Sequence, residues 1–349
     1  MTESTLIRRR RIVWTLATLA AILLSIVLLQ RPRDPDYRLT ERAGQSVFPR
    51  LARQIDAVQI IRVTASDLSY TMKRSPADPQ QWTMIESGSF PIRADRLGEL
   101  AQGVLSLAWG ETRTEDPAKL DRIGLGSPEN GGNGARIDMM DTDGDVLASL
   151  VTGRKGDRLY GRFPDESRAF LLSGDLPPLY TRQSWLDLNV LEMQEDAIGA
   201  IRITDRAGRG VYLARPPGSG ARAFRPAPPY EDWRMVSAIA ARGPALALSR
   251  FDPIDVKPAT AIETRRIGRH ITTTHDGLEI DVSAYEEPDG LYVTVRAVEA
   301  GEGAARASTI NKRAEGWAFR LAKIDWDEFT PSVRSIVRPP PPPADSPSP

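Results

Sequence analysis

The longest apolar run in the sequence lies near its N-terminus. Residues 12–29 (IVWTLATLAAILLSIVLL) contain no charged side chain. A helix of this length extends roughly 27 Å, close to the thickness of the hydrocarbon core of a bilayer. The pattern predicts a transmembrane helix with Ile12 and Leu29 at its ends and Trp14 near its start. We therefore expect this segment to anchor the chain in a membrane.

The charges beside this run predict its orientation. Arg8, Arg9, Arg10 and Arg11 stand directly before it, and further arginines follow it. Because cytoplasmic flanks of membrane helices collect Arg and Lys, the basic segment 1–11 is expected in the cytoplasm. The later arginines weaken this bias without reversing it. The bulk of the chain is then expected in the periplasm, on the outer side of a bacterial inner membrane.

Two other interpretations of the run stay open. A cleaved secretory signal needs a small-x-small site after its apolar stretch, and residues 28–32 (LLQRP) offer none. A buried helix of a soluble protein is the second alternative.

Beyond the run, most segments are typical of short strands. Residues 57–64 (AVQIIRVT) are rich in β-branched side chains and partly alternate apolar with polar positions. Tyr70–Lys73 and Trp82–Glu86 follow as strands. In residues 94–107, apolar side chains recur at every third or fourth position, which predicts a helix. This unit has the order β-β-β-α.

The same order recurs about 140 residues later. Residues 200–204 (AIRIT) resemble IIRVT, and Val211–Ala214 and Ala223–Arg225 follow as expected strands. A helix is expected from about Glu231, because Trp233, Val236 and Ile239 would share one face. Each unit continues into a hairpin, turned by Asp143-Gly144 in one and by Asp276-Gly277 in the other.

The repeat leads to a prediction of fold class and domain organisation. We expect an α+β fold with two duplicated, β-rich halves, residues 47–195 and 196–338, with mostly antiparallel sheets. Residues 30–46 are polar and read as a linker. Residues 339–349 begin with five prolines and are expected to form a disordered tail.

Composition excludes several kinds of chemistry. The sequence has no cysteine, which rules out thiol catalysis, cysteine zinc sites and iron–sulfur clusters. Acidic and basic side chains number 46 each, so no net charge favours binding to nucleic acid. The only histidines are His270 and His275, and we interpret both as surface or turn residues. We expect no catalytic residue, no metal site and no cofactor.

Three further features have both a chemical and a structural interpretation. Residues 141–145 (DTDGD) could begin a calcium loop, but the twelfth loop position is Thr152, and a hairpin turn is favoured. Residues 124–134 (GLGSPENGGNG) lack the Lys-Ser/Thr of a P-loop, which indicates a flexible connection. Six tryptophans beyond the apolar run would suit either sugar binding or core packing, and they are Trp82, Trp109, Trp185, Trp233, Trp317 and Trp326.

The order of these parts resembles a known family, the domain of unknown function 4340 family. The resemblance rests on the basic cap, the apolar run, FPRL (48–51), the Trp-containing strand and helix of residues 81–107, and three later motifs. These motifs are LDRIGLGSP (120–128), RLYGRF (158–163) and SWLDLNVL (184–191). The resemblance implies a cell-envelope accessory subunit that works with an ABC transporter of the gliding-motility (Gld) type. It implies no catalytic residue.

Three functions are therefore carried forward. The first is a non-enzymatic, membrane-anchored periplasmic accessory subunit that binds an ABC permease, associated envelope proteins or cargo. The alternative is a carbohydrate- or peptidoglycan-binding envelope module. The third is a carboxylate-based hydrolase, because glycosidase chemistry needs only two carboxyl groups. The oligomeric state, the transporter and the cargo are left open by the sequence.

Overall fold

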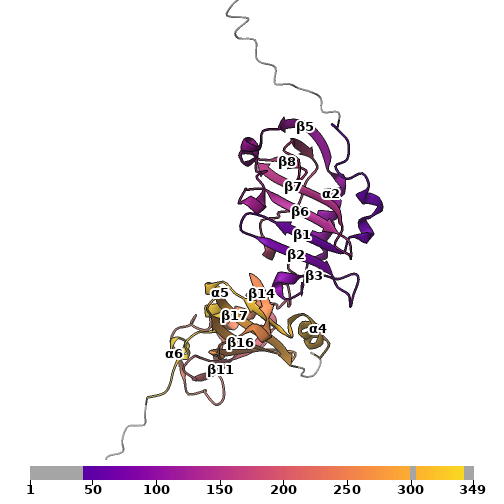
Figure 1. Ribbon diagram of the computed structural model, residues 1–349. Coiled ribbons are helices and arrows are strands. Elements are labelled where there is room, and N and C mark those ends of the chain that lie inside the picture. Colours follow the sequence, from indigo (N-terminus) through magenta and orange to yellow (C-terminus); the bar gives the residue numbers. More distant parts are fainter. Residues whose placement is uncertain (1–41, 299–303, 342–349) are drawn as a thin grey trace, which may run out of the picture.

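The computed structural model describes residues 42–298 and 304–341. The chain forms two β-sheet lobes placed end to end, and residues 42 and 341 lie at opposite ends of the molecule (Figure 1). The predicted membrane helix, residues 12–29, lies outside the described residues. Within the described ranges, no helix combines the length and the apolar character that crossing a bilayer requires.

The first lobe is built on a nine-stranded antiparallel sheet with the order β4-β3-β2-β1-β6-β7-β8-β9-β5. One long helix, α2 (Ala94–Ser106), packs against it (Figure 1). The strands are β1 (Ile60–Thr64), β2 (Ser69–Arg74), β3 (Trp82–Met84), β4 (Phe90–Pro91), β5 (Ala108–Thr114), β6 (Ala135–Met140), β7 (Val146–Lys155), β8 (Arg158–Arg162) and β9 (Ala169–Ser173).

The second lobe is built on an eight-stranded antiparallel sheet with the order β12-β11-β10-β15-β16-β17-β18-β14. Its strands are β10 (Ile198–Thr204), β11 (Gly210–Ala214), β12 (Arg225–Pro226), β14 (Asp255–Pro258), β15 (Gly268–Thr274), β16 (Glu279–Glu287), β17 (Gly290–Val298) and β18 (Trp317–Arg320). Its helices are α3 (Arg242–Leu246), α4 (Ala304–Ala314), α5 (Lys323–Phe329) and α6 (Val333–Ile336). The short strands β13 (Arg234–Met235) and β19 (Val337–Arg338) pair separately.

The prediction of an α+β fold with mostly antiparallel sheets is confirmed. The two sheets also share their connectivity: apart from the extra edge strand β4, the order β3-β2-β1-β6-β7-β8-β9-β5 matches the second sheet position by position. The two lobes differ in the connection that follows β8 in the first sheet and β17 in the second. Residues 163–168 connect β8 directly to β9, whereas α4 stands between β17 and β18.

Alternating burial explains why the central strands form where they do. Ile61 and Val63 of β1 are buried, and Arg62 between them is exposed. In β10, Ile201 and Ile203 are likewise buried. Such alternation places one face of each strand on the core, and the buried side chains of both lobes join in one continuous cluster.

The helix expected from Glu231 is wrong. Residues 231–241 contain turns and the strand β13, and the helix α3 begins only at Arg242. Arg234 and Met235 pair with β19, more than 100 residues later. Ile239, which the helix would have placed on its apolar face, is 57% exposed. A pairing so distant in sequence leaves no local periodicity to indicate it.

The two lobes are joined by a packed junction. The ring of Phe90 meets Trp317 edge-on at 4.9 Å between centroids, and Phe319 at 6.1 Å. Beside them, Arg182 contacts the buried carboxylate of Asp255 at 2.5 Å. Aromatic contacts and a paired, desolvated charge fix the relative orientation of the lobes more firmly than surface contacts would.

Gly88 lies at the same junction, and its backbone has φ +70°. A Cβ atom there would lie 2.4 Å from Cγ of Pro258 in the second lobe. We predict that Gly88→Ala lowers the free energy of unfolding by about 1–3 kcal/mol, through strain and overpacking together. Chemical denaturation measures this loss. Gly44→Ala is the matched control, because Gly44 has φ +80° and open space around it. Equal losses in both variants would contradict a steric role for Gly88 at the junction.

Candidate functional site

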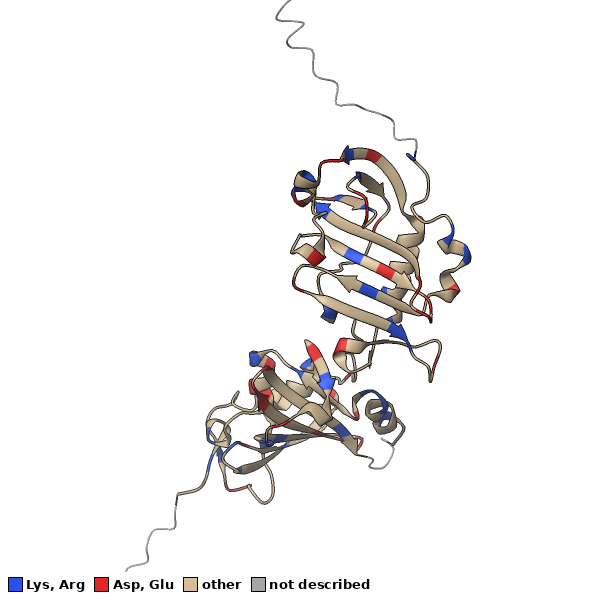
Figure 2. Ribbon diagram, viewed as in Figure 1, with Lys and Arg blue, Asp and Glu red and all other residues tan. Residues whose placement is uncertain are grey.

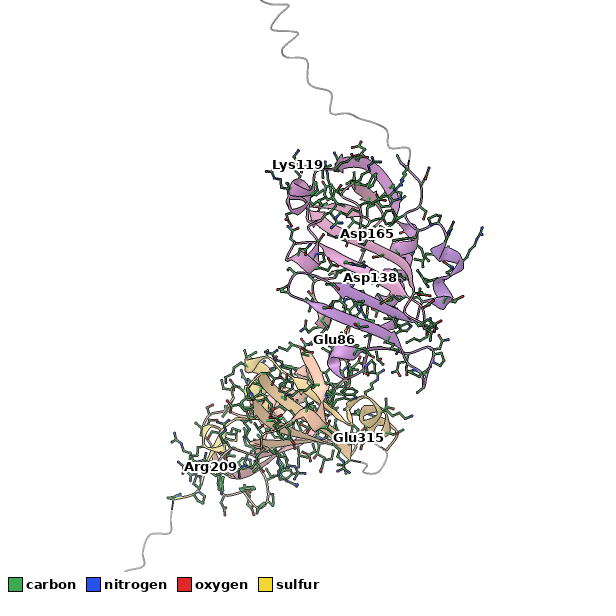
Figure 3. The ribbon with its side chains drawn as sticks, in the orientation of Figure 1. Glu86, Lys119, Asp138, Asp165, Arg209 and Glu315 are labelled. Atoms are coloured by element: carbon green, nitrogen blue, oxygen red, sulfur yellow. The ribbon has the colours of Figure 1, made fainter. Side chains whose placement is uncertain are left out.

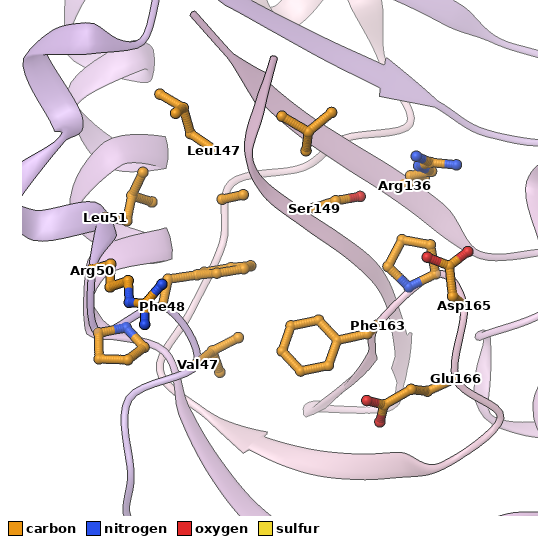
Figure 4. A pocket seen from close by; sticks show the side chains of 14 residues that line it. Val47, Phe48, Arg50, Leu51, Arg136, Leu147, Ser149, Phe163, Asp165 and Glu166 are labelled. Carbon is orange, nitrogen blue, oxygen red and sulfur yellow. The ribbon is translucent and has the colours of Figure 1, made fainter.

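A groove of about 570 Å³ lies on the first lobe, at the end of the molecule that carries residue 42 (Figure 4). Three segments and one strand residue line it: residues 47–51, 146–149 and 163–166, and Arg136. The first segment contains the FPRL motif, and the third follows directly after RLYGR. The groove therefore brings together parts of the chain that are more than 100 residues apart.

The floor of the groove is apolar. Val47 and Leu51 are buried, and the rings of Phe48 and Phe163 meet edge-on at 6.3 Å. Phe163 in turn packs on Trp109 at 5.1 Å, which connects the groove to the core. Val146, at the start of β7, is 54% exposed. An exposed aliphatic side chain on an apolar floor is typical of a surface that binds a partner.

Charged side chains stand around this floor. The Nε atom of Arg136 donates to Asp138 at 2.9 Å, and its Nη1 to Glu129 at 3.0 Å. Burial acts to lower the pKa of Arg136, but these hydrogen bonds outweigh it and raise the pKa, so this guanidinium stays charged. Asp138 also accepts a hydrogen bond from Ser149. Asp138 and Asp165 both lie on the first lobe in Figure 3.

Two charged side chains at the groove are available to bind a partner. Among the described residues, neither Arg50 nor Asp165 takes part in a side-chain hydrogen bond or ion pair. They stand on opposite sides of Phe163 in Figure 4. Glu166 lies 4.0 Å from Arg42. The groove thus offers an apolar floor, a cation on one side and carboxylates on the other.

Arg162 holds the wall of the groove in place from behind. It is only 2% exposed, and burial lowers its pKa. Its guanidinium donates to the carbonyl oxygens of Leu125 at 2.9 Å and Pro164 at 2.7 Å, and to Oγ of Ser127 at 2.7 Å. A single side chain of RLYGRF therefore ties the groove wall to the LDRIGLGSP motif.

The glycine-rich segment is an ordered loop and not the flexible connection expected from sequence. Gly132 N donates to Ser127 O, and Asn133 Nδ2 donates to Asp121 O at 2.7 Å. A Cβ atom on Gly153 of β7 would lie 1.8 Å from the carbonyl oxygen of Gly124. The glycines are required because the loop packs directly on the sheet backbone.

The SWLDLNVL motif also has a structural partner. Trp185, 1% exposed, packs against Tyr70, and its carbonyl oxygen accepts from the N–H of Arg93 at 2.8 Å. Leu186 forms a bridge with Ile92. The motif therefore covers the free edge of β4 and pairs with Ile92 and Arg93, directly before α2.

The DTDGD segment is the expected hairpin turn. The Oδ1 atom of Asp141 accepts from the N–H groups of Asp143 at 3.0 Å and Asp145 at 2.9 Å, and Gly144 has φ +89°. In the described part of the chain, no group of three or more His, Asp or Glu side chains is arranged to hold a metal ion.

The two histidines lie in different environments. His275 is exposed at the β15–β16 turn, as expected. The expectation for His270 is wrong, because its side chain is completely buried between Phe329 and the carbonyl oxygen of Pro244, at 2.8 Å from Nε2. Burial lowers the pKa of His270 to about 4. The neutral ring fills a core position of β15. The neighbouring polar residues TTT gave no indication from sequence that this strand is buried.

The tryptophans follow the packing interpretation. Four are buried, Trp82, Trp109, Trp185 and Trp326, and Trp233 and Trp317 are half-buried. Within the described residues, no tryptophan side chain is exposed as a sugar-binding platform requires. Positive and negative side chains are interspersed over both lobes (Figure 2), as the equal totals suggest.

A second depression, of about 680 Å³, lies between the lobes. Residues 93–95, 183–184, 186–189 and 251–253 line it. Its lining is mostly polar and includes the ion pair between Arg93 and Asp95. This depression is part of the junction between the lobes, and we do not treat it as a separate site.

Comparison with family models matches residues 82–250 to the domain of unknown function DUF4340. Over these residues the match confirms the resemblance to the DUF4340 family. Three of the motifs that carry the resemblance, LDRIGLGSP, RLYGRF and SWLDLNVL, lie within the match, whereas FPRL precedes it. The DUF4340 match thus runs from the start of β3 to Arg250, four residues beyond α3, and includes Arg162. Comparisons with curated proteins and with solved structures give no significant match.

We predict that Arg162→Met destabilises the protein by about 3 kcal/mol, because several buried carbonyl oxygens lose a charged donor. Thermal or chemical denaturation measures this change. Arg158→Met, at an exposed position of the same strand, is the control and should cost less than about 0.5 kcal/mol. Similar losses in the two variants would show that the network around Arg162 contributes little.

The buried His270 predicts a pH dependence of stability. Its folded pKa of about 4 lies below the ordinary value near 6.5, so the unfolded chain binds the extra proton. Stability should therefore be complete above about pH 6.5 and decrease by up to about 3 kcal/mol as the pH falls towards 4. His270→Leu should show a flatter dependence over this range, and His275→Leu should keep the wild-type slope. Parallel curves for His270→Leu and wild type would exclude this role.

Proposed function

We propose that this DUF4340 protein is a non-enzymatic accessory subunit of a Gld-type ABC transport system, anchored in the bacterial inner membrane and acting in the periplasm. The observation that carries the proposal is the position of the groove. Its wall begins at Val47, eighteen residues after the end of the apolar run at Leu29. Such a segment spans at most about 60 Å, which keeps the groove within reach of the extramembrane parts of a permease.

The chemistry of the groove supports a binding role. Asp138 is neutralised by Arg136 and is buried. An apolar floor with charges on opposite sides is suited to holding a polypeptide segment.

We also propose that the two lobes arose by duplication. Residues 47–64 and 187–204 lead into β1 and β10 through equivalent short 3-10 helices, Ile55–Ala57 and Glu195–Ala197. Without gaps, these segments share Leu, Gln, Asp, Ala, Ile, Arg and Thr at positions 51/191, 54/194, 56/196, 57/197, 61/201, 62/202 and 64/204. The shared strand order supports the same conclusion.

The test is photo-crosslinking in native membranes of the source organism. A photoreactive amino acid replaces Val146 in the full-length protein, and the crosslinked proteins are identified by mass spectrometry. We expect an ABC permease among them. The matched control carries the probe at Ile239, an equally exposed aliphatic position on the second lobe, and should not capture the permease. Capture of no transporter component from either position, with or without glycan fragments, would reject the proposed function.

A further inference from the structure

The second lobe shows what covers the position that is open as a groove in the first. In the second lobe, α4 packs against β17, and Ala307, Ile310 and Ala314 on one face of this helix are buried. In the first lobe, the corresponding connection between β8 and β9 has no helix. The surface that a helix would cover is therefore left exposed.

Strand register identifies the equivalent positions. Val63 pairs with Ile137, which pairs with Leu150, and in the same way Ile203 pairs with His270, which pairs with Val282. Leu150 and Val282 therefore correspond. Nearer the start of these strands, a register shift places Val146 opposite Met140, which corresponds to Thr273, the partner of Glu279. Val146 therefore corresponds to Glu279. Val146 is 54% exposed, whereas Glu279 is half-buried.

The next strand gives the same result. Val151 pairs with Arg162, and the corresponding Ser283 pairs with Thr294. The following residues, Phe163 and Val295, are thus equivalent. Phe163 is half-buried on the groove floor, whereas Val295 on the strand beneath α4 is 3% exposed.

Polar contacts at the two ends of α4 fall on equivalent positions too. Arg313 donates to the carbonyl oxygen of Asn189 at 2.9 Å. Asn189 is equivalent to Pro49 of the groove, because each lies 15 residues before the last residue of the corresponding strand, Thr204 or Thr64. Arg306 pairs with Asp276 of the β15–β16 turn at 2.5 Å. At the matching β6–β7 turn, the carboxylates of Asp143 and Asp145 are exposed.

We infer that the groove binds an amphipathic helix of a partner protein, in the place that α4 occupies in the second lobe. The helix presents small and aliphatic side chains at positions i, i+3 and i+7, as Ala307, Ile310 and Ala314 do. Basic side chains near its ends meet the carboxylates at Asp143, Asp145 and Asp165. The inference rests on the proposed function for the existence of a partner, and it states how that partner is recognised.

The probe that tests this inference is a hydrocarbon-stapled, fluorescein-labelled peptide with the sequence of residues 304–316. Its binding to the full-length protein in lipid nanodiscs is followed by fluorescence anisotropy. We expect saturable binding that weakens at least tenfold in Val146→Asp and is unchanged in Ile239→Asp. A peptide with Ile310→Asp should also bind at least tenfold more weakly. Both protein positions are exposed, so neither variant should impair folding.

Two results would overturn the inference: no saturable binding to the wild-type protein, or equal binding to wild type and Val146→Asp. Either can occur while crosslinking from Val146 still captures a permease, which would leave the proposed function intact and remove only the helical mode of recognition. Conversely, peptide binding without permease capture would keep the helix-binding groove and reject the transporter.

Discussion

The arrangement of the molecule depends on the junction at which Phe90 packs between Trp317 and Phe319. Through this contact the apolar cores of the two sheets join into one, so each lobe covers part of the other's core at the junction. Asp255 is buried there, and removing Arg182 would leave its carboxylate with two uncharged donors, Gln183 at 3.2 Å and the backbone N–H of Val256 at 2.8 Å. Breaking such a pair costs more than forming it contributes, which makes the junction specific as well as strong.

The motifs on which the family resemblance rests are explained by pairwise contacts of the backbone and core. Arg162 connects RLYGRF to LDRIGLGSP, Trp185 connects SWLDLNVL to the segment before α2, and Phe48 connects FPRL to Phe163. Each motif is therefore one side of a contact whose other side lies in another motif. The groove is formed where two of these contacts meet at the surface, which explains how structural motifs can also shape a binding site.

Sequence patterns were sufficient where the interactions that form an element are local. The hairpin turns at Gly144 and Gly277, the strand IIRVT and the helix α2 were all predicted, because alternation, turn residues and helical periodicity act over a few residues. The strand β13 was missed because its partner β19 is distant. The burial of His270 was missed because its hydrogen-bond partner, the carbonyl oxygen of Pro244, carries no sequence signal. The groove itself could not be predicted, since its walls come from three separate segments.

The C-terminal strand gives the molecule a defined weak point under load. β19 is held to β13 by a pairing of only two residues, whereas β16 and β17 pair over nine. Because residues 42 and 341 leave from opposite ends, tension applied between the termini acts along the whole molecule (Figure 1). The two-residue pairing should separate before the longer strand pairings of the two sheets. The C-terminal end would then lengthen under force while the binding surface of the first lobe kept its shape.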